Sequence, residues 1–225
     1  FQQGNIDAYA GIQKYGGPNA KGKQKLIIGP YGHGVLGKFA EAEFPNPMPK
    51  FEIFGSAWYD YWLKGEGKLI PKLPNVMYYT MGAVNEEGAP GNIWKSSNVW
   101  PVKAKNTPYY LHKDGKLSTK KQSDKNSKLT YKYDPANPVP TVGGNNLTIP
   151  SGPMDQRKIE DRDDVLIFTT DVLDESIEAT GRIKVDLWIS SSAKDTDFTA
   201  KLTDVYPDGR SMLICDGIIR AKYHN

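Results

Sequence analysis

The stretch KLIIGPYGHGV, residues Lys25 to Val35, runs from an apolar segment into a glycine-rich turn that carries a histidine. Its apolar part, Leu26 to Ile28, has no alternating polar residues, which is typical of a strand buried on both faces of a parallel α/β sheet. Ligand-binding and catalytic groups of such sheets lie just beyond the carboxyl ends of the strands. The stretch therefore predicts a buried strand that ends where chemistry is often done, with His33 in that position.

The composition is that of an ordinary globular protein. With 225 residues, 38% hydrophobic and 11% aromatic, the chain can build the core of one large domain or two small ones. Its 29 basic and 26 acidic residues are spread along the chain, so the net charge of +3 gives no argument for a nucleic-acid partner or an acidic membrane. No apolar run reaches the roughly 18 residues of a membrane span. The single cysteine, Cys215, excludes an internal disulfide and a multi-cysteine metal site.

The sequence pattern changes from mainly helical to mainly strand-like after about residue 66. Before that point, residues 5–15 and 51–67 show helical spacing of apolar side chains on either side of the buried strand. Beyond it, short strand-like segments alternate with Asp-Gly and Gly-Gly turn signals, which favours a two-sheet sandwich or jelly roll. The expected strands are 75–82, 107–117, 127–135, 164–173, 177–193 and 198–223. Residues 66–74 are the expected linker between the two parts.

His33 is a candidate general base. Histidine is the commonest general base, because an ordinary imidazole, with a pKa of about 6.5, is largely neutral and can accept a proton near neutral pH. Gly32 and Gly34 flank His33, and a turn that directs a side chain back over a strand edge often needs a residue without a Cβ. The alternative is an ordinary exposed or hydrogen-bonded loop histidine, and the residues alone leave both interpretations open.

The chain offers no convincing nucleophile for that base. The strained elbow Gly-x-Ser-x-Gly of α/β-hydrolases is absent, and Ser56 and Ser211 lack the paired glycines. Cys215 lies within an apolar segment, where a buried and inert thiol is expected. The residues alone therefore offer a candidate general base, His33, but no nucleophile that it could activate.

A family resemblance accounts for this. The stretches KQKLIIGPYGHG, WYDYWLKG, VMYYTMG and IEATGRIKVDLWISSSAKDTDF closely resemble the cocaine-esterase type of X-Pro dipeptidyl-peptidase-like serine hydrolases. That family includes α-amino-acid ester hydrolases and glutaryl acylases, and its members have an α/β-hydrolase domain, a helical cap and a C-terminal β jelly roll. The resemblance implies that residues 1–66 are the C-terminal part of the α/β-hydrolase domain. Residues 67–225 would be the jelly roll, cut short at its C-terminus.

The resemblance also implies a catalytic role for His33. The family histidine lies in a Gly-Pro-x-x-His motif, which is Gly29 to His33 here, so His33 would be the general base and acid. Tyr31 replaces the usual tryptophan of the motif, and Tyr31, Gly32 and Gly34 would support the histidine. The family order Ser, Asp, His places the serine and aspartate before Phe1, so the chain alone is expected to be inactive. Asp7 is rejected as a substitute because it lies on an amphipathic helical segment.

The implied reaction needs no metal and no organic cofactor. The expected partners are a small-molecule ester, amide or peptide substrate and the remainder of the same polypeptide, with no nucleic acid and no membrane, and a homo-oligomer is left open. The alternative function is a non-catalytic jelly-roll module that binds carbohydrate or a protein. The stretch KLIIGPYGHG argues against that alternative, because a binding module does not need a buried strand that ends in a glycine-flanked histidine.

Overall fold

The structure, a computed structural model, describes residues 2–49, 56–124 and 126–223. The chain forms two compact units, Phe1–Lys38 with Glu43–Lys103, and Phe39–Ala42 with Ala104–Asn225. The described elements are mostly strands, with few helices. This content fits a β-sandwich C-terminal domain. Within the described ranges, only one pair of named strands runs parallel. The many-stranded parallel sheet of a complete α/β-hydrolase is therefore not present in the described residues.

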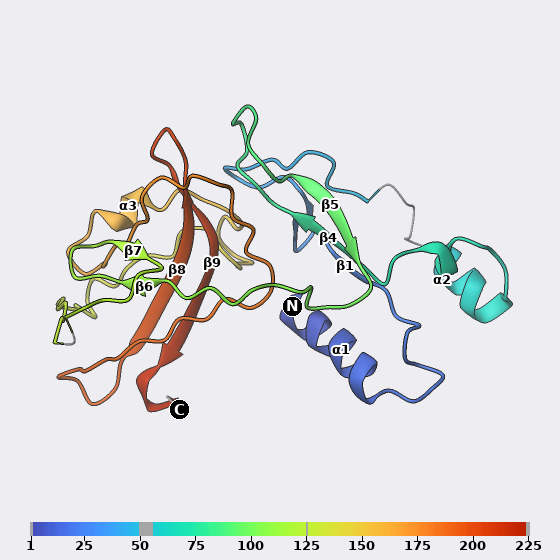
Figure 1. The fold of residues 1–225 in the computed structure, drawn as a ribbon, viewed down its shortest axis with the longest axis horizontal. Helices are drawn as coiled ribbons and strands as arrows, with labels where there is room; N and C mark the ends of the chain where they lie inside the picture. The colour runs from blue at the N-terminus through green and yellow to red at the C-terminus, as the bar shows by residue number, and fades with distance from the viewer. Residues whose placement is uncertain (1, 50–55, 125, 224–225) are drawn as a thin grey trace. The chain divides into compact units, whose positions relative to one another are not determined.

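The first unit is built on a three-stranded sheet. Its strands are β1 (Leu26–Ile28), β4 (Val76–Thr80) and β5 (Ile93–Ser97), in the order β1-β4-β5 (Figure 1). β1 and β4 run parallel and β4 and β5 antiparallel. The predicted strands at Leu26 to Ile28 and within 75–82 are confirmed. β5 was not predicted, because its sequence IWKSS is neither continuously apolar nor alternating.

Helix α1 (Gln2–Tyr15) covers one face of this sheet. Tyr9 of the helix packs with Leu26 and Val76 in a buried cluster, and Val76 is completely buried. The helix predicted over residues 5–15 is thus confirmed. Because side chains alternate between the faces of a strand, the neighbours of Leu26 and Val76 point to the opposite side of the sheet.

The opposite face is covered by the segment that was expected to be a linker. The short 3-10 helix η2 (Ile70–Lys72) places Ile70 against Met77 of β4, and Leu73 joins the same cluster. Ile70 is 2% exposed and Leu73 is 4% exposed. Part of the expected linker, residues 66–74, therefore packs on the sheet, because burial of these apolar side chains outweighs the prolines beside them.

This packing also moves the boundary between the two parts of the chain. The expected division between residues 66 and 67 does not separate the two units. β4 and β5 follow that point in sequence, yet they hydrogen-bond into the sheet that contains β1. The first unit consequently continues to Lys103.

The aromatic helical segment is described from Ser56 onward. α2 (Ser56–Tyr59) continues into the π-helical turn η1 (Asp60–Lys64), which ends at Gly65 with a φ of 74°. Residues 51–55 of the predicted helix lie outside the described residues. Trp58 and Tyr61 pack against the cluster of Ile70, as an aromatic face predicts. Among the described residues, no helix is both long enough and apolar enough to cross a membrane.

The second unit contains two antiparallel hairpins. The larger joins β8 (Asp197–Val205) to β9 (Ser211–Arg220), and the smaller joins β6 (Tyr110–Leu111) to β7 (Leu117–Ser118). The Asp-Gly turns that were predicted to close them are present, with positive φ at both glycines: 83° at Gly115 and 85° at Gly209. Two short helices complete the unit, α3 (Arg157–Glu160) and η3 (Ala221–Tyr223).

Three predicted strands of this unit do not form. The segments 127–135, 164–173 and 177–193 contain no strand, apart from an isolated bridge between Thr169 and Lys116. A strand is stabilised by hydrogen bonds to a neighbour and by burial of one face. In 177–193 no neighbouring strand pairs within the described residues, and Trp188 is fully exposed. The β-like pattern alone is insufficient to form a strand without that partner.

Candidate functional site

His33 lies at the tip of a short hairpin that follows β1. The hairpin pairs β2 (Tyr31–Gly32) with β3 (Val35–Leu36), and His33 and Gly34 form its two-residue turn. Gly34 has a φ of 73°, a region that glycine adopts without steric cost. The structure therefore brings Tyr31, Gly32, His33 and Gly34 into one turn, directly beyond the carboxyl end of a parallel strand. The His33 side chain is exposed there.

Tyr31 packs over Gly29 at the base of the hairpin. A Cβ on Gly29 would lie only 2.2 Å from Cζ of the Tyr31 ring. The Tyr31 backbone N–H donates to the Gly29 carbonyl at 2.8 Å, which closes a tight turn around Pro30. Burial raises the pKa of Tyr31, so its phenol keeps its proton at neutral pH. Tyr31 is therefore a packing residue of this site and not a second base.

The next loop, residues 44–48, is tied to the same hairpin. The Gly37 N–H donates to the Pro30 carbonyl at 2.9 Å, and the Phe44 N–H donates to the Gly37 carbonyl at 2.7 Å. Gly37 has a φ of 77°, and a Cβ at this position would lie 2.5 Å from Cβ of Pro47. Backbone hydrogen bonds at Gly37 thus hold the hairpin and the loop together, at a position where a side chain would overlap Pro47.

An aromatic cluster of Tyr31, Phe44, Tyr79 and Trp94 lies under the hairpin. Tyr79 and Trp94 are opposite each other on β4 and β5, with ring centroids 5.5 Å apart. Tyr31 lies 6.4 Å from Trp94, and Phe44 lies 6.2 Å from Tyr79. Sequence reasoning did not include Tyr79 or Trp94 in the site. Alternation in 75–82 could place Tyr79 on one face of a strand, but it could not identify the loop that packs there.

The other candidate residues do not gather at His33. Asp7 is exposed on α1 and accepts a hydrogen bond from Gln3 at 2.8 Å. Ser56 is exposed at the start of α2, while Ser211 is buried in the second unit and donates to Glu160 at 2.6 Å. Cys215 is half-buried in β9, where burial and then the Asp216 carboxylate raise the pKa of its thiol. A thiol that holds its proton is a poor nucleophile, as expected from its apolar sequence context.

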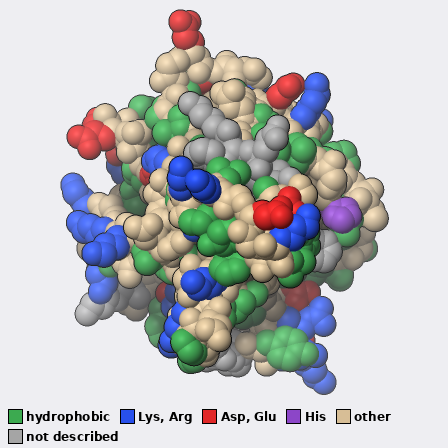
Figure 2. All heavy atoms as spheres, turned by 90° about the vertical axis from the view of Figure 1, so that its right-hand side faces the viewer, with side chains coloured by type: hydrophobic (Ala, Val, Ile, Leu, Met, Phe, Trp, Pro, Cys, Tyr) green, Lys and Arg blue, Asp and Glu red, His purple; other side chains and the backbone are tan. Residues whose placement is uncertain are grey.

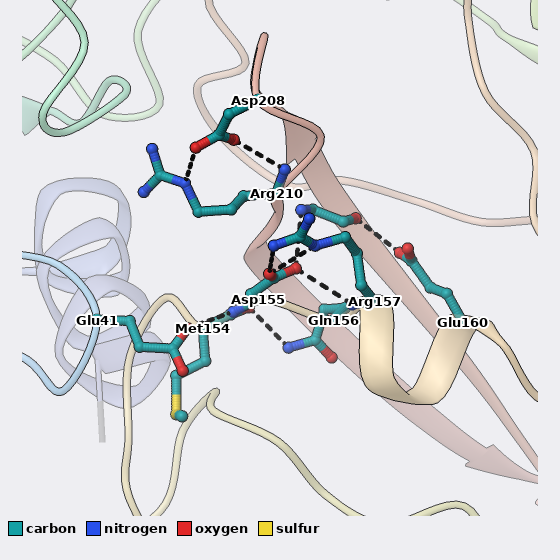
Figure 3. Close-up of polar contacts among 9 residues, drawn as sticks. Glu41, Met154, Asp155, Gln156, Arg157, Glu160, Asp208 and Arg210 are labelled. Atoms are coloured by element: carbon teal, nitrogen blue, oxygen red, sulfur yellow. Dashed lines mark hydrogen bonds and ion pairs between the residues drawn. The ribbon is translucent and has the colours of Figure 1, made fainter.

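A second polar cluster, centred on Asp155, lies in the second unit (Figure 3). The Asp155 carboxylate accepts hydrogen bonds from Nε of Arg157 at 2.7 Å and from the backbone N–H of Ser211 at 3.0 Å. The Asp155 N–H donates to Glu41 at 2.7 Å. These contacts join the start of α3, the start of β9 and the segment around Glu41, so the cluster is structural.

The same contacts change the acidity of Asp155. Burial has the largest single influence and would raise its pKa, but the hydrogen bonds from Arg157 and from the Ser211 and Arg157 backbone together lower the pKa below its usual value. Asp155 is therefore ionised at neutral pH. Within the described ranges, no group of three or more His, Cys, Asp or Glu side chains is arranged to hold a metal ion.

A shallow hollow of about 260 Å³ lies elsewhere on the first unit. Its lining residues are Gln24, Lys25, Ile27 and Trp58, and His33 is not among them. The Lys25 ammonium already donates to the Leu73 carbonyl at 2.6 Å. Figure 2 views the molecule from the side on which α2 lies in Figure 1, where green hydrophobic patches are interrupted by Lys and Arg side chains.

The described part of the chain is sheet-rich and carries a histidine turn directly beyond a parallel strand. Residues 70–225 match the family described as the X-Pro dipeptidyl-peptidase C-terminal non-catalytic domain, and the chain belongs to this family. The resemblance to cocaine-esterase and X-Pro dipeptidyl-peptidase-like proteins, C-terminal portion, is thereby confirmed.

Two known proteins illustrate this relationship. Cocaine esterase of Rhodococcus sp. (strain MB1 Bresler) is 40% identical over 215 residues, which cover 88% of this chain and 36% of that protein. The crystal structure of an aminopeptidase from the marine sediment archaeon Thaumarchaeota archaeon superposes with a TM-score of 0.70 and 25% identity, covering 96% of this chain and 37% of that one. The chain thus spans little more than a third of the length of either relative.

Proposed function

We propose that residues 1–225 are part of a serine hydrolase that cleaves ester or amide bonds, with His33 as its general base and acid. One observation carries the proposal: His33 occupies the turn directly after β1, the parallel strand of a sheet covered on both faces. That is the edge at which α/β enzymes carry their catalytic groups. The relationship to cocaine esterase favours an ester substrate. The likeness to an aminopeptidase makes an amide bond the second candidate, since both bonds are cleaved by acyl transfer.

The proposed reaction has two acyl-transfer steps. His33 takes the hydroxyl proton of a serine, whose oxygen attacks the substrate carbonyl. His33 then gives that proton to the departing alcohol or amine, which leaves an acyl-enzyme. Water, deprotonated by His33, then attacks the acyl-enzyme carbonyl. The serine oxygen leaves and takes that proton back from His33, which releases the carboxylic acid and restores the serine hydroxyl. A carboxylate that accepts a hydrogen bond from the imidazole would hold its tautomer and orientation.

The serine and the carboxylate would come from other parts of a longer polypeptide. The sequence has no Gly-x-Ser-x-Gly elbow, and the relatives extend well beyond the aligned region. In this proposal residues 1–66 belong to the end of an α/β-hydrolase domain. The apolar strand β1, packed between α1 on one face and η2 on the other, supports that assignment, because strands covered on both faces are characteristic of α/β sheets. Its parallel partner β4 lies beyond residue 66, so the hydrolase part and the following part share one sheet.

The second unit would belong to a β jelly roll. The β8–β9 hairpin and the small β6–β7 hairpin support a sheet architecture. Residues 183, 185, 187 and 189 are all apolar and half-exposed, which is the alternation of a strand with one face to bury. Pairing of this segment with a further strand would complete a second sheet.

The proposal is tested by substituting His33 in the longer polypeptide that contains this chain. We expect His33→Gln to lower kcat for p-nitrophenyl acetate by about a thousandfold or more, because removal of a triad member leaves only binding and oxyanion stabilisation. His112→Gln is the matched control: this histidine is in the second unit, where its ring contacts the Lys120 carbonyl at 2.9 Å. Wild-type turnover by His33→Gln would reject the hydrolase role and favour a non-catalytic binding module.

A further inference from the structure

The aromatic support of the His33 hairpin comes from the part of the chain that matches a non-catalytic domain. Tyr79 of β4 and Trp94 of β5 lie within residues 70–225. The hairpin and the loop 44–48 lie before residue 70. Within the first unit, residues of the family domain therefore contact the segment that carries the candidate catalytic histidine.

Two hydrogen bonds fasten the loop to the sheet. The Tyr79 hydroxyl donates to the Pro45 carbonyl at 2.6 Å, and the Trp94 Nε1–H donates to the Asn46 carbonyl at 2.9 Å. Asn46 has a φ of 50°, in the left-handed region that asparagine tolerates better than most residues. The side chains of two paired strands, β4 and β5, thus bind the consecutive carbonyls of Pro45 and Asn46 in the loop.

The fastened loop is coupled to both ends of the hairpin. Phe44 is bonded to Gly37 and Gly37 to Pro30, and the Tyr31 ring packs against Trp94 itself. A shift of the Pro45 and Asn46 carbonyls would therefore be transmitted to the residues on each side of the turn. His33 occupies that turn, so its orientation depends on contacts made far away in sequence.

We propose that Tyr79 and Trp94 are positioning residues for His33. By holding the Pro45 and Asn46 carbonyls they fix the hairpin, and so keep the imidazole where it can exchange a proton with the nucleophilic serine. This inference rests on the proposed function of His33. In this inference β4 and β5 contribute to the efficiency of catalysis, although they belong to a domain described as non-catalytic.

The test uses Tyr79→Phe and Trp94→Phe in the longer polypeptide. Tyr79→Phe removes one hydroxyl, and Trp94→Phe removes the indole N–H but keeps an aromatic ring. We expect each to lower kcat about fivefold, the effect of one lost hydrogen bond, with KM nearly unchanged. The acidic limb of the pH profile of kcat/KM should move as well, because it reports the catalytic base.

Tyr78→Phe is the matched control for Tyr79→Phe. Tyr78 is the neighbouring residue of β4 but packs on the opposite face, with its ring 5.8 Å from that of Trp100. We expect wild-type kcat and an unchanged pH profile for this variant. In hydrogen exchange, the Gly32 and Val35 amides should exchange faster in Tyr79→Phe and Trp94→Phe than in Tyr78→Phe.

The outcomes separate the inference from the function on which it rests. If His33→Gln retains turnover, the proposed function fails. If His33→Gln is inactive while Tyr79→Phe and Trp94→Phe match Tyr78→Phe in kcat and pH profile, the positioning role fails and the function stands. If Trp94→Phe does not fold, Tyr79→Phe alone decides, since it removes a single oxygen atom.

Discussion

Gly29 is required by a neighbouring ring and not by its backbone angle. The Tyr31 ring lies where a side chain on Gly29 would project, and the close contact sets the direction in which the chain leaves β1. At Gly34 the requirement is different, because that residue has a positive φ at the tip of the hairpin. Two glycines within six residues are thus needed for separate physical reasons, and both reasons concern the placement of His33.

Gly29→Ala is expected to destabilise the first unit by about 1–3 kcal/mol, the usual cost of overpacking, because the new methyl group overlaps the Tyr31 ring. The measurement is urea unfolding followed by tryptophan fluorescence, since Trp58, Trp62, Trp94 and Trp100 lie in this unit. Gly17→Ala is the control, because no atom lies within 4 Å of the added group. Equal stability of the two variants would contradict the packing role of Tyr31.

At the scale of elements, the Asp155 cluster joins α3 to β9. Asp155 binds the N–H groups of Arg157 and Ser211, and Ser211 binds Glu160 in the same helix. The helix has only four residues, which is too short to be stable by itself. Its position therefore depends on these side-chain contacts with the first residue of the strand.

Asp155→Asn is expected to destabilise the second unit by about 1–3 kcal/mol at pH 7, because hydrogen bonds to a charged group are lost. The folded-state pKa of Asp155 is lowered, so its stabilising effect is present above the unfolded-state value of about 3.9. That effect disappears as the pH falls through the lower, folded-state pKa. The difference between wild type and variant should consequently shrink in acid.

Hydrogen exchange of the β9 amides between pH 3 and pH 7 measures this difference. Asp186→Asn is the control, since the Lys184–Asp186 pair is exposed and should contribute little. A difference that persists unchanged at low pH would show that the Asp155 charge is not responsible.

At the scale of the whole molecule, the chain holds a candidate base without its nucleophile. Ser56 and Ser211 belong to other structural settings, and the Cys215 thiol is protonated. We therefore expect a fluorophosphonate probe to leave the 25.0 kDa chain unmodified and to label the longer polypeptide at a serine outside residues 1–225. Intact-mass spectrometry distinguishes the two results, and a probe adduct on the 25.0 kDa chain itself would contradict the assignment.

The sequence by itself determined the local features. The apolar run at Leu26 to Ile28 predicted β1, helical spacing predicted α1, and Asp-Gly pairs predicted the turns at Gly115 and Gly209. These features depend on burial periodicity and on backbone angles, which neighbouring residues encode. The resemblance carried by Gly29 to His33 and the other motifs identified the family.

Only the tertiary structure decided which segments meet. It placed Ile70 and Leu73 in a core instead of a linker, and it left residues 177–193 without a paired strand. It also brought Tyr79 and Trp94 under the His33 hairpin. These outcomes depend on contacts between residues distant in sequence, and a local pattern records that a side chain is apolar or aromatic but not which surface it will contact.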